Sequence, residues 1–457
     1  MDHLDRDIMQ HSDTAASNAL VTIIIVDARA SGQANAIHKC AGHIRHHNDT
    51  EVDIIGIGIG IDKYMSPGTE PPLHIAQDIN EAVQRCHTPW VMLCDSSTRL
   101  VDHALDRLVA TATERGANAV IAGLDEPNES IFTLQGKLFA TSALQDIDLS
   151  DCDVWDDGYI TLQHIMAKAR NVAGIGENLF DSADLTHVAK SLTPAHNELL
   201  YRMGTLYCEI QLCDRCNLDC AYCSHLSPIS QPVRIDLDTL KDECHRLAKI
   251  GFDEVNLMGG EPLLHPQVIE AIQLTRSILP DIKLIVSTNG LLLPRMTREF
   301  WQCCRDNKVV LRITPYPRAK GGTWNYFKYL YLIKKNHVRM ESTGWRFGFR
   351  HQLLSEKAEF DATSNYLRCQ LHCTQVRDAT LWPCAYVAYA FNLNNKFGTN
   401  FKHAAGDSLP LTDDTTATDV RLWLLRTKPF CSHCGITNAK HVNWKRSEYA
   451  RSEWLQD

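Results

Sequence analysis

The most informative stretch of the chain is CNLDCAYC, residues 216–223. It places Cys216, Cys220 and Cys223 in a CxxxCxxC loop directly after the apolar run TLYCEIQLC, which predicts a buried strand over residues 205–213. Three thiolates this close in sequence can hold one face of a [4Fe–4S] cluster and leave the fourth iron without a protein ligand. A structural zinc site is the alternative, but it normally takes four ligands.

Strands and helices alternate after this loop. We expect helices over 237–250, 266–278 and 294–304, and strands over 254–259, 283–290 and 309–317. Repeated units of this length are typical of a barrel or partial barrel, whose chemistry lies at the carboxyl ends of the strands. Two further motifs fall on such ends, Gly259-Gly260-Glu261-Pro262 and Ser287-Thr288-Asn289-Gly290.

CxxxCxxC, GGEP and STNG after three successive strands resemble the radical S-adenosylmethionine (SAM) superfamily, over roughly residues 203–350. The resemblance implies an α/β fold with a partial (β/α)6 barrel. It implies that the three cysteines hold the cluster and that SAM chelates the unique iron. One-electron reduction of SAM would then give methionine and a 5′-deoxyadenosyl radical, which abstracts hydrogen from the substrate.

The resemblance also implies which residues bind SAM: Tyr222, Gly259, Gly260, Glu261, Pro262, Ser287, Asn289 and Arg312. We expect Tyr222 to contact adenine, and Glu261 or adjacent carbonyls to accept from the SAM ammonium. The two glycines would let the backbone approach the methionine moiety. Arg312 is either a partner for the SAM carboxylate or one half of a structural ion pair.

A second group of cysteines lies near the carboxyl terminus. Cys373, Cys384, Cys431 and Cys434 follow the pattern C-x10-C-x46-C-x2-C, which indicates a second Fe–S cluster or, less favoured, structural zinc. The pattern resembles the shortened SPASM domain called Twitch and implies one auxiliary [4Fe–4S] cluster that exchanges an electron with the substrate. Cys369 competes with Cys373 for the first position, and we prefer Cys373.

The first 200 residues have a different character. They hold 13 basic and 29 acidic residues, against 33 and 26 in the remainder, which indicates a domain boundary near 200. Strands and helices again alternate after a polar tail, and the order resembles a glycosyltransferase-A nucleotide-sugar domain. That family holds a divalent metal with a DxD motif, where this chain has Asp95-Ser96-Ser97. Asp156 and Asp157 fall where the family keeps its catalytic base. Histidines 38, 43, 46 and 47 are interpreted as a solvated helix face.

These boundaries give a flexible tail over 1–18, a glycosyltransferase-A-like domain over 19–198 with a linker at 191–198, a radical SAM core over 203–365 and an auxiliary-cluster domain over 366–457. Hydrophobic residues make up 44% and charged residues 22% of the 457, which is typical of folded globular proteins. The sequence shows no membrane span, no secretory signal and no dense basic face for nucleic acid, so we expect a cytoplasmic enzyme.

We expect a radical SAM oxidoreductase or mutase that acts on a sugar, nucleotide-sugar or glycan precursor by dehydrogenation, epimerisation or deoxygenation. A flavodoxin or ferredoxin would supply the electron. Two alternatives stay open: a peptide-modifying radical SAM maturase, and a non-catalytic carbohydrate-binding scaffold whose clusters are structural.

Overall fold

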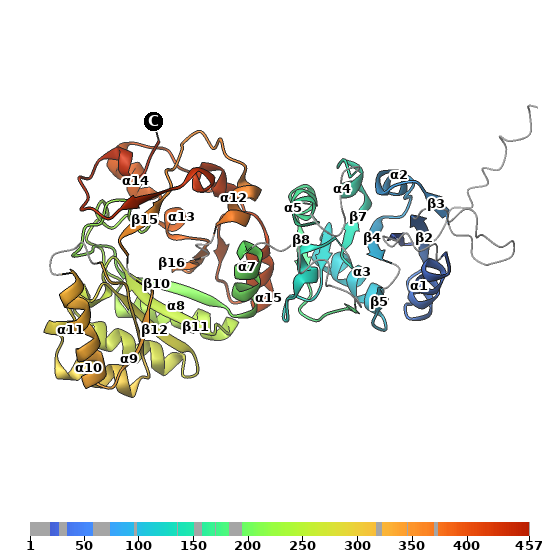
Figure 1. Cartoon of the computed structure of the whole chain (residues 1–457). Coiled ribbons are helices and arrows are strands. Elements are labelled where there is room, and N and C mark those ends of the chain that lie inside the picture. The colour runs from blue at the N-terminus through green and yellow to red at the C-terminus, as the bar shows by residue number, and fades with distance from the viewer. Residues whose placement is uncertain are drawn as a thin grey trace, which may run out of the picture. The chain divides into compact units, whose positions relative to one another are not determined.

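Figure 1 shows the computed structural model of the chain. The described residues are 19–26, 34–57, 74–95, 98–134, 136–149, 158–169, 171–181, 194–316, 322–344, 346–369 and 373–456. The chain divides into two units, Met1–Ser191 and Leu192–Asp457, and each unit has its own sheet. Within the described ranges, no helix combines the length and the apolar character needed to cross a membrane.

The first unit is built on a seven-stranded sheet in the order β3-β2-β1-β4-β7-β6-β8. Only β7 runs antiparallel to its neighbours. Its strands are β1 (Val21–Val26), β2 (Val52–Ile57), β3 (His74–Ala76), β4 (Trp90–Asp95), β6 (Ala119–Ile121), β7 (Leu138–Ala140) and β8 (Val172–Gly174). Three consecutive isoleucines in β1, residues 23–25, are fully buried. Burial on both faces is what a central strand of a parallel sheet needs.

Helices and one short strand pair complete this unit: α1 (Ala34–His46), α2 (Ile79–Gln84), α3 (Ala104–Arg115), α4 (Thr141–Gln145), α5 (Gly158–Ala169), and β5 (Arg99–Leu100) paired with β9 (Phe180–Asp181). The carboxylate expected to bind a divalent metal is at Asp95, whose side chain lies outside the described residues, as do Ser96 and Ser97. Asp156 and Asp157 also lie outside them. The metal site therefore stays a prediction.

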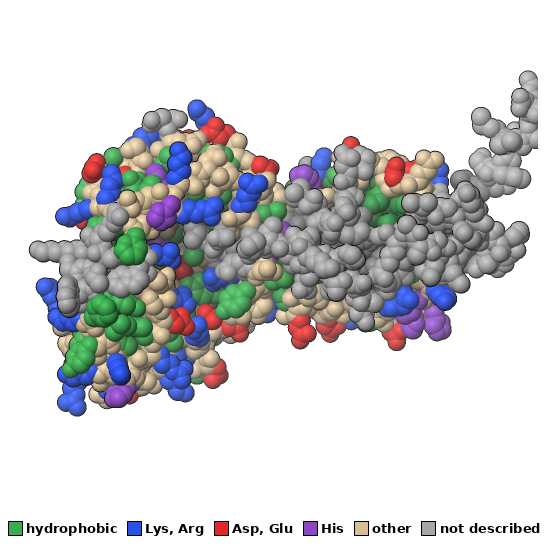
Figure 2. All heavy atoms as spheres, viewed as in Figure 1, with side chains coloured by type: hydrophobic (Ala, Val, Ile, Leu, Met, Phe, Trp, Pro, Cys, Tyr) green, Lys and Arg blue, Asp and Glu red, His purple; other side chains and the backbone are tan. Residues whose placement is uncertain are grey.

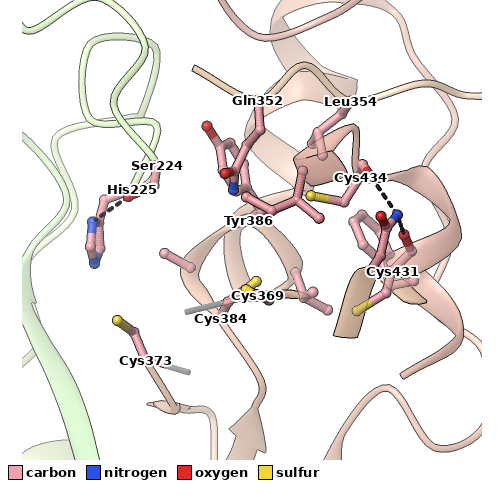
Figure 3. Close-up of a pocket in the computed structure, with 15 residues that line it drawn as sticks. Ser224, His225, Gln352, Leu354, Cys369, Cys373, Cys384, Tyr386, Cys431 and Cys434 are labelled. Carbon is pink, nitrogen blue, oxygen red and sulfur yellow. Dashed lines mark hydrogen bonds between the residues drawn. The ribbon is translucent and has the colours of Figure 1, made fainter. Parts of the chain in front are cut away.

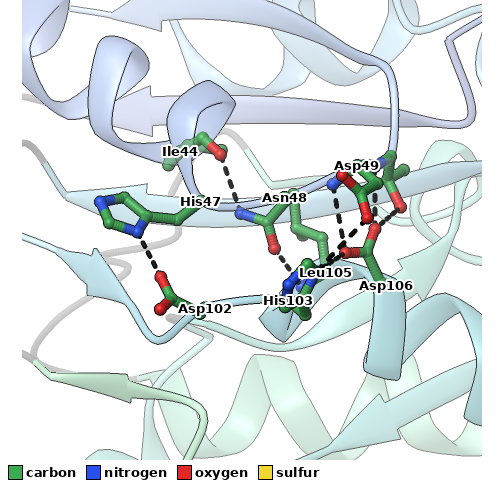
Figure 4. A network of polar contacts seen from close by, with 9 residues as sticks. Ile44, His47, Asn48, Asp49, Asp102, His103, Leu105 and Asp106 are labelled. Atoms are coloured by element: carbon green, nitrogen blue, oxygen red, sulfur yellow. Dashed lines mark hydrogen bonds and ion pairs between the residues drawn. The ribbon is translucent and has the colours of Figure 1, made fainter.

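A polar network joins the end of α1 to the start of α3 (Figure 4). Asp106 accepts hydrogen bonds from the backbone N–H of Asp49 at 3.1 Å and of Thr50 at 2.8 Å, and contacts His103 Nδ1 at 3.0 Å. His47 pairs with Asp102. His43 Nε2 also lies 3.0 Å from the Leu100 carbonyl oxygen. His43 and His47, two of the four histidines that we interpreted as a solvated helix face, therefore contact other residues of this unit.

Asp106→Ala removes the acceptor of two backbone N–H groups. We expect a loss of about 0.5–1.5 kcal/mol in the free energy of unfolding of the first unit, which is the net contribution of a typical hydrogen bond, because these donors are exposed or only partly buried. Urea denaturation of the full chain, followed by circular dichroism, measures this. Asp102→Ala is the control, because Asp102 is exposed and holds no backbone N–H; equal midpoints for both variants would contradict the assignment.

The second unit is built on an eight-stranded sheet in the order β14-β13-β12-β11-β10-β16-β17-β18. Six neighbouring strands, β14 through β16 in this order, are parallel, and the last two pairings are antiparallel. The strands are β10 (Tyr207–Cys213), β11 (Glu254–Gly259), β12 (Lys283–Thr288), β13 (Val310–Ile313), β14 (Arg339–Ser342), β16 (Gln375–Arg377), β17 (Thr380–Trp382) and β18 (Leu409–Pro410).

The helices of this unit are α7 (Pro194–Gly204), α8 (Leu237–Ile250), α9 (Val268–Ile278), α10 (Arg298–Asp306), α11 (Gly322–Lys335), α12 (Ala362–Arg368), α13 (Ala385–Tyr389), α14 (Phe391–Phe397) and α15 (Ala417–Leu425). A separate strand pair joins β15 (Gly348–His351) to β19 (Lys440–Asn443) in antiparallel register. Figure 1 shows α8 to α11 gathered on one side of the sheet. Figure 2 shows apolar side chains on the surface near α11, where Phe327 is 58% and Tyr331 63% exposed.

Two features of this unit differ from the expected boundaries. The expected linker at 191–198 overlaps α7, whose residues Leu199 and Met203 are buried four positions apart, as on an amphipathic helix. The sheet also continues past residue 365, because β16 pairs in parallel with β10. Two of the carboxyl-terminal cysteines, Cys373 and Cys384, therefore flank strands of the same sheet that carries the CxxxCxxC loop.

Candidate functional site

The CxxxCxxC loop leaves the carboxyl end of β10, a strand buried along its whole length. Its cysteines line a cavity of about 330 Å³ together with residues that follow β11 and β12. Among the predicted site residues, this cavity brings together Cys216, Cys220, Tyr222, Cys223, Gly259, Gly260, Ser287 and Asn289. Glu261, Pro262 and Arg312 are not among the described residues that line it.

The glycines of the GGEP motif pack against the chain itself. A Cβ on Gly259, whose φ is +153°, would lie 2.3 Å from the Cys213 carbonyl oxygen. A Cβ on Gly260 would lie 2.4 Å from the Arg215 carbonyl carbon. Both positions therefore require glycine because the end of β11 crosses the backbone that leads to Cys216. We had expected the glycines to make room for the ligand, and the close contact in the structure is with the chain.

Glu261 is fully buried and joins the two motifs. Its carboxylate accepts hydrogen bonds from Thr288 Oγ1 at 2.7 Å, from the Asn289 N–H at 3.0 Å and from the Leu263 N–H at 3.1 Å. Burial raises the pKa of Glu261 to about 7. Pro262 begins the short 3-10 turn Pro262–Leu264 that follows. These residues shape the loops next to the cavity.

Asn289 contacts the cysteine loop directly. Its side-chain amide donates to Asn217 Oδ1 at 2.7 Å and lies 3.6 Å from Cys216 Sγ. Burial and, after it, the Glu261 carboxylate raise the pKa of Cys216 to about 12. The ring of Tyr222 lies 4.2 Å from that of His351, measured between centroids.

Arg312 takes the structural role that we had kept open. Its guanidinium donates to Glu341 at 3.0 and 3.2 Å, and Lys283 pairs with the same carboxylate at 2.9 Å. Arg312 lies opposite Glu341 in the pairing of β13 with β14, so the register of the sheet positions this ion pair. Lysine and arginine share one carboxylate on the edge of the sheet.

The second group of cysteines lines another cavity, of about 70 Å³ (Figure 3). Five cysteines contribute to it: Cys369, Cys373, Cys384, Cys431 and Cys434. Asn365 on α12 holds the turn between the last two by donating to their carbonyl oxygens at 2.8 and 2.6 Å. In Figure 3, Cys373 lies toward His225, apart from Cys431 and Cys434.

The thiols of this group oppose one another's ionisation. Burial and, after it, Cys369 raise the pKa of Cys384 to about 12. The pKa of Cys431 and that of Cys434 are likewise raised, first by burial and then by Cys369. For Cys373 the largest contribution after burial comes from Glu209. Buried thiols of this kind need a positive charge to ionise, which a cluster or metal ion supplies.

One layer of side chains separates the two cavities. Ser224, His225, Gln352 and Tyr386 line both of them. Tyr386 is buried, which raises its pKa, and the thiolates of Cys434 and Cys223 raise it further. A single ring is therefore close to both groups of cysteines.

A buried carboxylate supports this layer. His225 Nε2 lies 3.6 Å from Glu209 Oε2, and Glu209 also accepts from Tyr207 Oη at 2.6 Å and from the side chain of Gln375. No motif in the sequence pointed to Glu209, Gln352 or Tyr386 as site residues. A glutamate inside an apolar strand such as YCEIQLC was the available signal, because buried carboxylates are rare unless they are paired.

Residues 210–311 match the family model described as the radical SAM superfamily. The chain carries a radical SAM domain. The match falls within the residues that showed the resemblance, and the family implies a [4Fe–4S] cluster and SAM as cofactors. The GTP 3′,8-cyclase of Rippkaea orientalis is 35% identical over 108 residues, which cover 21% of this chain and 31% of that protein. This chain thus spans about a third of the length of its curated relatives.

Two solved structures are also similar. Streptococcus suis SuiB bound to the precursor peptide SuiA has 12% identity and a TM-score of 0.27, covering 35% of this chain and 38% of that one. S. aureus TarS in complex with UDP-GlcNAc has 9% identity and a TM-score of 0.28, covering 63% and 80%. Both TM-scores are low, and the assignment of the domain rests on the family match.

Glu261→Ala leaves the Asn289 and Leu263 N–H groups buried without an acceptor. We expect the free energy of unfolding of the second unit to fall by about 1–3 kcal/mol for each unpaired donor. The urea midpoint of the full chain measures the loss. Glu299→Ala, in the exposed first turn of α10, serves as the control. A urea midpoint for Glu261→Ala as high as that of the control would contradict a stabilising role for the hydrogen bonds that Glu261 accepts.

Proposed function

We propose that the chain reductively cleaves SAM at a [4Fe–4S] cluster held by Cys216, Cys220 and Cys223. The observation that carries the proposal is the convergence of three thiols and two strand-end motifs on one cavity large enough for a small organic molecule. When bound, the cluster and SAM supply one electron and a 5′-deoxyadenosyl radical that removes a hydrogen atom from the substrate. A flavodoxin or ferredoxin is the proposed reductant.

The chain's own residues bind SAM and hold the loops around the cavity in position. We assign Tyr222, Ser287 and Asn289 to SAM, because their side chains or backbones line the cavity beside the cysteines. Gly259 and Gly260 bring β11 against the cysteine loop, and Glu261 with Pro262 fixes the GGEP turn relative to the STNG turn.

Apolar side chains pack around the cysteines. Leu218 and Cys220 are buried together, and Cys216 and Cys223 pack against them with the partly buried Leu291, Tyr316 and Phe349. Because water competes for reactive intermediates, an apolar lining protects the hydrogen-transfer step. The wall that contains His225, Gln352 and Tyr386 supplies polar atoms for a substrate, and the buried Gln352 Oε1 has no partner among the described residues.

The second cavity is proposed to hold an auxiliary [4Fe–4S] cluster, which accepts an electron from the substrate or returns one to it. Four thiolates would complete its coordination. We favour Cys369, Cys384, Cys431 and Cys434 as this set, because Figure 3 shows Cys369 beside Cys384, whereas Cys373 lies toward His225 and apart from Cys431 and Cys434. Our sequence-based preference was Cys373, whose strongest charged neighbour is Glu209.

The proposed substrate is a sugar, nucleotide-sugar or glycan precursor. The support is the fusion of the radical SAM domain to an α/β unit with a mostly parallel sheet, an architecture that binds nucleotides at the carboxyl ends of its strands. The test is SAM cleavage to 5′-deoxyadenosine under dithionite with a panel of sugars and nucleotide-sugars. If none of them stimulates the cleavage, this substrate class is wrong.

The triple variant Cys216→Ala/Cys220→Ala/Cys223→Ala tests the catalytic cluster. We expect about eight irons in the anaerobically reconstituted wild type and about four in the variant, with SAM cleavage lost. Cys86→Ala, in the first unit and outside both groups, is the control and should keep both. An unchanged iron content in the triple variant would falsify the assignment.

Cys369→Ser and Cys373→Ser separate the two candidates for the fourth auxiliary ligand. We expect Cys369→Ser to lose up to about four irons, or to show the altered EPR signal of an incomplete coordination shell, because it removes a ligand. Cys373→Ser should keep the wild-type iron content and signal. The reverse pattern would restore Cys373 as the ligand.

A further inference from the structure

The last residues of the chain fold back over the CxxxCxxC loop. We call residues 440–456 the carboxyl-terminal segment. Its Lys445 carbonyl accepts from the Ala221 N–H at 3.0 Å, and its Ser447 N–H donates to the Asp219 carbonyl at 2.7 Å. Arg446 pairs with the Asp219 carboxylate at 3.0 Å. The segment is therefore bonded to the loop between its cysteines.

This contact holds an unusual backbone conformation. Asp219 and Tyr222 both have positive φ values, 49° and 65°, in the left-handed region that non-glycine residues rarely adopt. Each such residue costs roughly 1–2 kcal/mol relative to the right-handed region. The backbone hydrogen bonds from the carboxyl-terminal segment compensate for this cost and fix the direction in which the cysteine side chains leave the loop.

Two tryptophans of the segment point at the loop in chemically different ways. Trp444 Nε1 lies 3.0 Å from Cys220 Sγ and donates to the sulfur. Trp454 Nε1 donates to the Cys223 carbonyl oxygen, also at 3.0 Å. One indole therefore contacts a thiol, while the other contacts only the backbone. This difference separates an electronic effect on the sulfur from support of the loop.

An N–H donor stabilises negative charge on sulfur. The Trp444 indole N–H, with Nε1 at 3.0 Å from Cys220 Sγ, is placed to act in this way. Reduction of a thiolate-bound cluster adds an electron, so a donor to a coordinating sulfur favours the reduced state. Hydrogen bonds to the sulfurs are among the factors that set the potentials of such clusters.

We infer that Trp444 is a positioning residue that raises the reduction potential of the catalytic cluster by donating its indole N–H to Cys220. The inference rests on the proposed function, because it requires Cys220 to be a cluster ligand. It assigns a redox role to a residue that lies 224 positions along the chain from its partner.

Trp444→Phe keeps an aromatic ring and removes the donor. In the full-length reconstituted protein, we expect the equilibrium constant for reduction of the catalytic cluster to fall about tenfold, which is about 59 mV for one electron. EPR-monitored redox titration measures it. The catalytic signal is identified by its absence from the Cys216→Ala/Cys220→Ala/Cys223→Ala variant. Trp454→Phe is the matched control and should keep the wild-type potential.

The outcomes are distinguishable. A potential in Trp444→Phe equal to that of the wild type, at full iron content, would overturn the inference and leave the proposed function intact. A shift of the same size in Trp454→Phe would assign the effect to loop support and would also overturn it. If no EPR signal depends on the three cysteines, the proposed function itself fails.

A second measurement covers the case in which Trp444→Phe does not hold its cluster. Wild-type protein that contains ¹⁵N-indole tryptophan is reduced, and electron–nuclear double resonance is recorded before and after exchange into D₂O. We expect a hyperfine-coupled indole nitrogen and an exchangeable proton on the catalytic signal. Their absence would contradict a hydrogen bond from Trp444 to the cluster.

Discussion

Burial of cysteine thiols is the constraint on which the second unit depends. In each cavity several cysteines are removed from water, and burial opposes their ionisation. Cys216 and Cys384 illustrate this, because burial, followed by Glu261 at Cys216 and by Cys369 at Cys384, raises the pKa of each to about 12. A protein has little to gain from such an arrangement unless a cationic centre compensates the thiolates. The fold around both cavities is consistent with that requirement.

Segments that are far apart in the sequence contact the two groups of cysteines. The CxxxCxxC loop is contacted by Asn289 after β12 and by the carboxyl-terminal segment. In the second group of cysteines, Cys373 and Cys384 flank the strand pair β16–β17, which extends the same sheet. The two cavities are consequently separated by one layer of side chains, to which Tyr386 contributes. An electron leaving a substrate in the first cavity would have little protein to cross.

The sequence was informative where chemistry is local. CxxxCxxC, GGEP and STNG follow neighbouring parallel strands, and the carboxyl ends of such strands share one edge, so their meeting was predictable. The contacts between segments that are distant in the sequence could not be predicted in this way. No local pattern indicates that Glu261 accepts from the STNG turn or that Trp444 donates to Cys220. The roles of Cys369 and Cys373 likewise depend on where α12 ends, which the spacing of cysteines does not encode. We expected a linker at 191–198, where the structure has the start of α7, because proline and polar residues there obscure the apolar periodicity of the helix.

Two clusters held in these cavities would lie close together, across the layer that contains Tyr386. Magnetic interaction between the reduced clusters measures this closeness, because dipolar coupling between paramagnets weakens steeply with distance. EPR spectra of the fully reduced wild type should be broadened or split relative to the sum of spectra from two variants that each keep one cluster. A wild-type spectrum equal to that sum would contradict the account.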